Sequence, residues 1–183
     1  MTWETDPPIH ANLTWPLIDY ATRKRAPEPL IYFDAGFNPR NSKYPVKAKR
    51  GLHWSPLTRE EETMFVSLGA FISNMVIINK RLEAWPIHIR MSHNIRIIDV
   101  FRAIYDVYAQ PLTERELRDC GPEYIQRCER AFLQRCQDGP DFAHNEQRKG
   151  MLRIDLLRGR RVFKGLTPIP GQPHTFELLF DDI

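Results

Sequence analysis

Basic residues interleaved with aromatic residues are the most visible chemical feature of the sequence. No acidic residue occurs between positions 40 and 50. The basic residues of this stretch are Arg40, Lys43, Lys47, Lys49 and Arg50. Tyr44 lies among them, and His53 and Trp54 follow directly. Because lysine and arginine neutralise phosphates and aromatic rings stack on bases, this stretch is a candidate site for nucleic acid or another polyanion.

Two further basic clusters lie elsewhere in the chain. One is the run Arg23-Lys24-Arg25, and the other comprises Arg158, Arg160, Arg161 and Lys164. The formal net charge is only +3, which is small for a dedicated nucleic-acid-binding protein. Short basic runs also serve in nuclear import or in docking an acidic partner. Nucleic-acid binding therefore predicts that the three basic clusters converge on one face.

Proline and aromatic residues together indicate a second class of function. Residues 1–29 form a proline-rich stretch that carries Trp3, and the stretch 38–58 carries Tyr44 and Trp54. Extended segments with aromatic anchors lose little entropy on docking to a protein. We therefore predict a non-catalytic protein-binding or scaffolding module that uses Trp3, Tyr44 and Trp54. The partner is another protein or a second copy of the chain, and an arm that packs back on its own domain is the alternative.

Metal binding and catalysis have weaker support. The cysteines Cys120, Cys128 and Cys136 are eight positions apart, so on a helix they point about 80° away from one another and do not grip one ion. His88 and His93 have no third ligand nearby in sequence, and no phosphate-binding glycine loop or G-x-S-x-G turn occurs. We predict no metal and no cofactor. An enzyme ranks third, because its site would have to be assembled from distant segments.

Composition and termini bound the fold and the compartment. The chain has 183 residues, of which 42% are hydrophobic and 27% charged, as is typical of globular proteins. No apolar run reaches the roughly 18 residues of a membrane span, and the first residues lack the features of a secretory signal. The odd number of cysteines favours a reducing compartment with free thiols. We expect an intracellular, cytoplasmic protein, with the nucleus as an alternative, and no membrane partner.

Hydrophobic periodicity and capping signals predict the elements that position these residues. Strands are expected at 30–33, 75–78, 85–91, 152–156, 160–163 and 175–181. Helices are expected from capping boxes at Thr58 and Thr113, and over 97–109 and 122–137. Segments 34–58 and 137–150 are expected to be loops. The order of elements predicts one α+β domain over 30–183, with a mostly antiparallel sheet packed by two main helices and an extended arm at 1–29. We expect Trp15, Leu17 and Ile18 to dock this arm on the domain.

Several of these segments together resemble a known family. They are Trp15-Pro16-Leu17-Ile18, Trp85-Pro86-Ile87-His88-Ile89, Asp99 to Tyr105, Gln110-Pro111-Leu112-Thr113, Arg130-Ala131-Phe132, Arg153 to Leu157 and Phe163-Lys164-Gly165-Leu166. With them the chain resembles a domain-of-unknown-function family abundant in basidiomycete and other fungi. The resemblance covers residues 75–180 well and the first half of the chain poorly, and it departs from the family pattern at Arg96. It implies a fungal, intracellular protein and no activity that could be assigned residue by residue.

Overall fold

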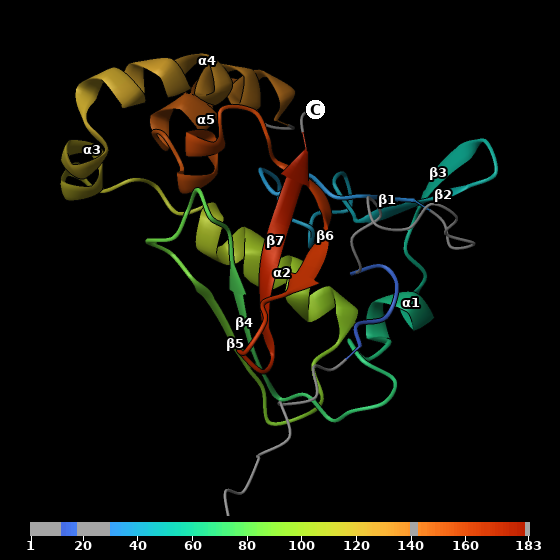
Figure 1. The fold of residues 1–183 in the computed structure, drawn as a ribbon. Coiled ribbons are helices and arrows are strands. Elements are labelled where there is room, and N and C mark those ends of the chain that lie inside the picture. The colour runs from blue at the N-terminus through green and yellow to red at the C-terminus, as the bar shows by residue number, and fades with distance from the viewer. Residues whose placement is uncertain (1–11, 18–29, 140–142, 182–183) are drawn as a thin grey trace, which may run out of the picture.

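The computed structural model describes residues 12–17, 30–139 and 143–181 (Figure 1). The strands are β1 (Ile31–Tyr32), β2 (Lys47–Arg50), β3 (His53–Pro56), β4 (Asn74–Ile78), β5 (Ile87–Arg90), β6 (Val162–Pro168) and β7 (Thr175–Asp181). The helices are α1 (Arg59–Thr63), α2 (Ile97–Tyr108), α3 (Glu114–Cys120), α4 (Pro122–Asp138), α5 (Ala143–Arg148) and the 3-10 helix η1 (Arg153–Leu157). This arrangement confirms the predicted α+β class.

The strands form two sheets. The smaller sheet has the antiparallel order β1-β2-β3, and the larger has the order β5-β4-β7-β6. Among the described strands of the larger sheet, only β4 and β7 pair in parallel, and the β4–β5 hairpin is the one predicted from sequence. The β2–β3 hairpin projects from the body of the molecule, while α3, α4 and α5 gather at one end of the larger sheet (Figure 1).

Helix α2 supplies the centre of the core, as its apolar stripe predicts. Phe101 and Ile104 are fully buried. The Phe101 ring meets the rings of Phe33 and Phe163 edge-on, with centroids 5.0 and 5.1 Å away. The stripe therefore joins the segment after β1 to β6.

Local capping signals define where the shorter helices begin. The Thr58 hydroxyl accepts from the Glu61 amide at 3.2 Å, and the Glu61 carboxylate accepts from the Thr58 amide at 2.7 Å. The same reciprocal pair opens α3 at Thr113, and Pro122 is the first residue of α4. All three starts are as predicted, because a cap depends only on residues within one turn.

Three predictions for individual segments are wrong. The expected loop 34–58 contains β2 and β3. The single buried residue of β2 is Ala48, whose small side chain does not produce the apolar alternation that predicts a strand. The expected strand 152–156 falls in η1, in which four consecutive residues from Ile154 are buried. The expected strand 160–163 therefore has no partner there. Its last two residues, 162–163, begin β6, which pairs with β7. The expected loop 137–150 contains α5, which has no apolar stripe because its single buried side chain is that of Glu146.

The described part of the N-terminal arm docks as predicted. Leu17 is fully buried, and its carbonyl oxygen accepts from the Leu166 amide of β6 at 2.7 Å. The Thr14 amide donates to the Val66 carbonyl at 2.9 Å. Trp3, Ile18 and the run Arg23-Lys24-Arg25 lie outside the described residues. Within the described residues, no helix combines the length and apolar character needed to cross a membrane.

Candidate binding surface

Cross-strand pairing in the small sheet places aromatic and basic side chains on one face. Tyr32 of β1 is opposite Lys47 of β2, and Lys49 of β2 is opposite Trp54 of β3. Directly opposed residues of an antiparallel pair project to the same side, and Lys47 and Lys49 alternate with the buried Ala48. These four side chains therefore share the face directed away from Ala48.

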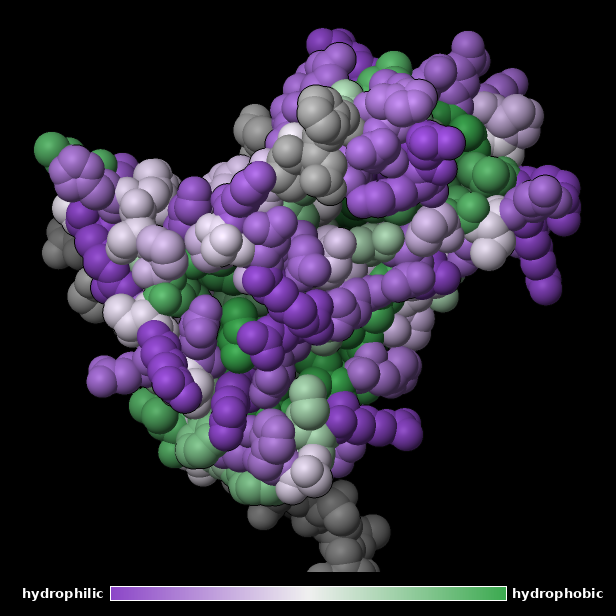
Figure 2. All heavy atoms as spheres, turned by 180° about the vertical axis from the view of Figure 1, so that it is seen from behind, coloured by the Kyte–Doolittle hydropathy of each residue, from purple (hydrophilic) through white to green (hydrophobic). Residues whose placement is uncertain are grey.

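The aromatic residues of this face are exposed. The Trp54 and Tyr32 rings meet edge-on with centroids 6.0 Å apart, and their residues are 45% and 36% exposed. Leu30 and Leu52 extend the apolar area, with Leu52 at the hairpin tip 90% exposed. Figure 2 shows apolar and hydrophilic side chains side by side on the projecting hairpin. Exposed large apolar groups that gather in one place mark interaction sites.

A cavity of about 290 Å³ extends this face toward the body of the molecule. Lys43 and Tyr44 line it together with Tyr32 and Lys47. The Tyr44 ring stacks on Phe37 with centroids 4.5 Å apart, and its hydroxyl donates to the Asp138 carbonyl at 3.3 Å. We refer to Tyr32, Lys43, Tyr44, Lys47, Lys49 and Trp54 as the aromatic–lysine surface.

The cavity floor is a buried ion-pair network. Arg161 is 3% exposed, and its Nε donates to both carboxylate oxygens of Asp34 at 2.8 and 2.9 Å. Its Nη2 donates to Asp138 Oδ2 at 2.7 Å. Burial raises the pKa of the Asp34 carboxyl above its ordinary value, although Arg161 acts in the opposite direction. Two carboxylates thus engage the single guanidinium of the floor, which leaves the rim lysines as the cations available to a ligand.

The three lysines differ in this respect from the two arginines predicted with them. Lys43, Lys47 and Lys49 form no ion pair with any residue that the structure describes. Arg40 instead forms a two-bond ion pair with Asp106 of α2, both bonds being 2.7 Å. Arg50 binds Glu61 at the start of α1 and donates to the Ser55 hydroxyl at 3.0 Å.

The structure therefore brings together part of each predicted set and adds residues to it. Tyr44 and Trp54 share one surface with the three lysines, whereas Trp3 lies outside the described residues. Sequence reasoning missed Tyr32 and Asp34. The strand pattern at 30–33 predicts that the Tyr32 and Phe33 side chains point to opposite faces of the sheet. Which side chains lie next to Tyr32 follows only from the register of β1 with β2.

The third basic cluster is divided between roles. Arg161 belongs to the buried floor, Lys164 lies 3.8 Å from Asp181, and Arg158 is exposed on the turn before β6. The run at 23–25 lies outside the described residues. Convergence of all three basic clusters on one face, which nucleic-acid binding requires, therefore stays a prediction.

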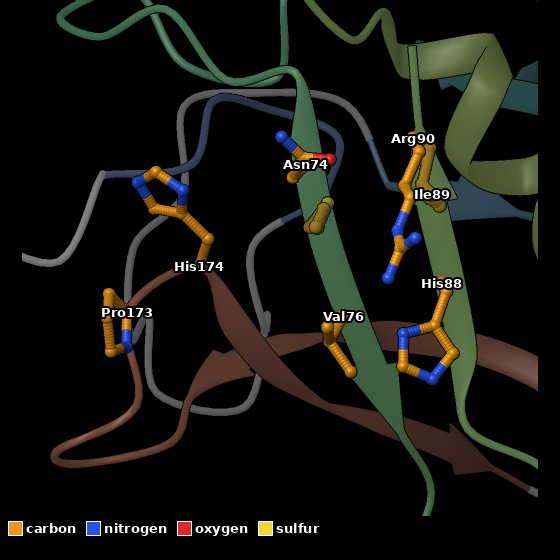
Figure 3. Close-up of a pocket in the computed structure, with 8 residues that line it drawn as sticks. Asn74, Val76, His88, Ile89, Arg90, Pro173 and His174 are labelled. Carbon is orange, nitrogen blue, oxygen red and sulfur yellow. The ribbon is translucent and has the colours of Figure 1, made fainter.

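A second cavity, of about 430 Å³, lies on the open face of the larger sheet (Figure 3). His88 and Arg90 project from β5, whereas His174 enters from the turn before β7, on the other side of β4. Among the described residues, no group of three histidine, cysteine or acidic side chains could hold a metal ion.

Cys120, Cys128 and Cys136 are free, and burial raises the pKa of each thiol, which leaves the thiols protonated.

The chain matches a known family model. A model described as a family of unknown function (DUF6699) matches residues 31–174. This range contains the whole aromatic–lysine surface and ends one residue before β7. No curated protein and no solved structure matches the chain.

Proposed function

Since the chain belongs to this family of unknown function, we propose from the geometry that it is a non-catalytic protein-binding module. Its aromatic–lysine surface binds an extended, acidic segment of a partner protein. The observation that carries the proposal is the position of two exposed rings, Trp54 and Tyr32, on the same face as Lys47 and Lys49.

The aromatic side chains supply the contact area. Tyrosine and tryptophan bury a large surface while losing few rotamers, and they dominate the energetic centres of protein interfaces. Trp54 is held against Tyr32, and Tyr44 is held by Phe37 and the Asp138 carbonyl. The rings are therefore positioned before a partner arrives, which reduces the ordering cost of binding.

The lysines supply the preference for an acidic partner. Three ammonium groups surround the rings without ion pairs to described residues. Charges of this kind at the rim of an interface steer an oppositely charged partner and suppress wrong ones. The adjoining cavity of about 290 Å³ accepts one side chain of the bound segment.

The polyanion alternative has less support. Arg40 and Arg50, two of its five predicted contacts, are engaged by Asp106 and Glu61. The three remaining lysines would give a slope of log K against log salt of about −2.7 on duplex DNA, which corresponds to a small electrostatic contribution to binding. An enzyme would need reactive groups that converge in a pocket, whereas the charged floor of this cavity is internally paired.

The experiment selects ligands from a displayed library of random, extended peptides and measures their affinity by isothermal titration calorimetry. We expect acidic sequences with apolar residues. Trp54→Ala should weaken the binding of these peptides by about 2 kcal/mol or more. Tyr44→Ala is measured in the same assay. Phe71→Ala is the matched control, because Phe71 is 68% exposed on the loop before β4. Trp3→Ala tests the predicted anchor of the arm in the same assay.

Charge is tested separately. Replacing Lys43, Lys47 and Lys49 with Ala should mainly slow association, whereas the control triple Arg59→Ala, Arg115→Ala and Arg118→Ala removes equal charge from α1 and α3. Peptides whose affinity is insensitive to Trp54→Ala would refute the proposal. Micromolar binding of duplex DNA at about 150 mM salt, lost in the lysine triple, would establish the polyanion alternative. A dimer dissociated by Trp54→Ala would identify the partner as a second copy.

We also propose an intracellular, cytoplasmic location. Three unpaired cysteines support it, because free thiols persist in reducing compartments. Detection of the chain in secreted material with oxidised cysteines would contradict this.

A further inference from the structure

A second concentration of positive charge lies between α4 and the turn that joins η1 to β6. These segments enclose a cleft of about 390 Å³. Its charged and polar lining residues are Arg127, Arg130, Gln134, Arg158 and Arg161. No aspartate or glutamate among the described residues lines this cleft. It is separate from the aromatic–lysine surface. Among the described residues, only Arg161 lines both this cleft and the cavity of about 290 Å³ beside that surface.

Local structure directs these side chains to one place. Arg127, Arg130 and Gln134 are spaced i, i+3 and i+7 on α4, so they lie on one face of the helix. Arg158 caps η1 in the left-handed conformation, with φ 56° and ψ 44°. A non-glycine residue rarely adopts this conformation, and strained residues of this kind gather at ligand-binding sites.

The two walls of the cleft are fixed to each other from below. Arg135 of α4 forms a buried ion pair with Asp155 of η1 at 2.8 Å. The Tyr124 hydroxyl of α4 donates to the Leu156 carbonyl at 2.7 Å. Because these contacts hold α4 and η1 in place, a ligand finds the cleft already formed and pays little ordering entropy.

The charges of the cleft are largely uncompensated. Arg161 is paired with both Asp34 and Asp138. Arg130 and Arg158 form no side-chain hydrogen bond or ion pair with the residues described. Arg127 Nε donates to its own helix, to the Glu123 carbonyl at 3.3 Å, and its guanidinium lies over the Tyr124 ring. Like charges gathered in a cleft focus a positive potential, which a bound anion relieves.

We propose that this cleft binds a phosphate monoester. The planar fork of a guanidinium matches two phosphate oxygens, and arginine clusters are a recurrent means of recognising phosphorylated groups. Arg127, Arg130 and Arg158 donate to the phosphate oxygens, and the Gln134 amide borders them. The phosphate belongs to a small molecule or to a phosphorylated side chain, which present the same dianion. This proposal does not depend on the function of the aromatic–lysine surface.

The test is calorimetric titration of the full chain with O-phosphoserine and with a short Gly/Ser peptide that carries one phosphoserine. Arg130→Gln and Arg158→Asn should each weaken binding about tenfold or more, since each removes a charge-assisted hydrogen bond. Asparagine is chosen at position 158 because it tolerates the left-handed conformation. The matched control is Arg115→Gln on α3, where the arginine side chain is 87% exposed, and its affinity should equal that of the parent chain.

Two further measurements identify the chemistry. Affinity for O-phosphoserine should rise between about pH 5 and pH 7.5, because the second ionisation of the phosphate occurs near about pH 6, whereas affinity for sulfate should stay constant. Arg130→Lys keeps the charge and removes the fork, so it should weaken binding. Tighter binding of the peptide than of O-phosphoserine identifies a phosphorylated protein as the source, and equal binding identifies a small molecule.

Three outcomes overturn the proposal. The first is titration without saturation by either phosphate probe. The second is equal weakening by Arg115→Gln, which shows general charge attraction. The third is equal affinity for sulfate and for O-phosphoserine over the whole pH range. If Arg158→Asn fails to fold, Arg130→Gln carries the test, because position 130 is exposed on the surface of α4.

Discussion

Gly36 lies between two buried arginines, where a larger residue has no room. A Cβ atom at this position would lie 3.1 Å from Asp34 Oδ1 and 3.2 Å from the Cδ atoms of Arg135 and Arg161. The side chains of Asp34, Arg135 and Arg161 are all held in buried ion pairs. They can move away from an added methyl group only if those ion pairs are distorted. Gly36→Ala should therefore lower the free energy of unfolding by about 1–3 kcal/mol in urea denaturation.

Gly69 is the matched control for this substitution. A Cβ atom there would have nothing within 4 Å, so Gly69→Ala should be neutral or stabilise by about 0.4–1 kcal/mol through the unfolded state. Equal effects of the two substitutions would show that the contacts around Gly36 are not tight.

Phe101 is the residue whose truncation should cost most in the core. It is fully buried and contacts two other rings, so Phe101→Ala should lower the free energy of unfolding by about 3–5 kcal/mol. Phe71→Ala, at a position 68% exposed, should change it by no more than about 0.5 kcal/mol. A loss under about 1 kcal/mol for Phe101→Ala would contradict the packing of α2.

At the scale of elements, Glu116 fastens the start of α3 to two other segments. Its carboxylate accepts from the Thr113 amide at 2.7 Å, from Trp85 Nε1 at 2.7 Å and from Arg153 Nη2 at 3.1 Å. These contacts lower the pKa of Glu116 from 4.5 to about 2. The hydrogen bond from the Thr113 amide contributes most, and Trp85 and Arg153 act in the same direction. Because the folded state favours the ionised form, this contribution to stability is complete above the ordinary pKa and lost as the pH falls through about 2.

The prediction concerns the slope of stability against pH. In the parent chain, the free energy of unfolding should fall as the pH decreases from about 4.5 to about 2, and Glu116→Gln should flatten this fall. The control is Glu114→Gln in the same first turn, whose side chain is 94% exposed and should leave the slope unchanged. Identical slopes for the parent chain and Glu116→Gln would contradict the role of this carboxylate.

At the scale of the whole molecule, one buried ion pair connects the two ends of the fold. Arg161 and Asp34 are 127 positions apart in sequence, and their contact joins the segment after β1 to β6. Asp34→Ala should lower the free energy of unfolding by about 3–5 kcal/mol, because it leaves a buried guanidinium without its main partner.

Asp106 provides a matched comparison, because it also forms a two-bond pair with an arginine. The Arg40 and Asp106 side chains are 42% and 51% exposed, so Asp106→Ala should cost less than about 1 kcal/mol. Equal costs at the two positions, measured by urea denaturation, would show that burial does not set the strength of these pairs.

Sequence alone determined the features that depend on neighbouring residues. The stripe of α2, the caps at Thr58 and Thr113, the start of α4 at Pro122 and the β4–β5 hairpin were all predicted. A helix face repeats every three to four residues and a cap spans one turn, so the information lies within a short window. The basic and aromatic residues at 40–54 were also visible as a candidate surface.

Tertiary structure decided which of those residues act together. Arg40 leaves the surface because Asp106, 66 positions away, lies within reach, and Tyr32 joins it because β1 pairs with β2 in one register. Tertiary contacts also decide η1 and α5. Both pack against α4, where Arg135 forms ion pairs with Asp155 of η1 and with Glu146 of α5. Registers and buried ion pairs form between distant segments, and their energies depend on packing that no local pattern encodes.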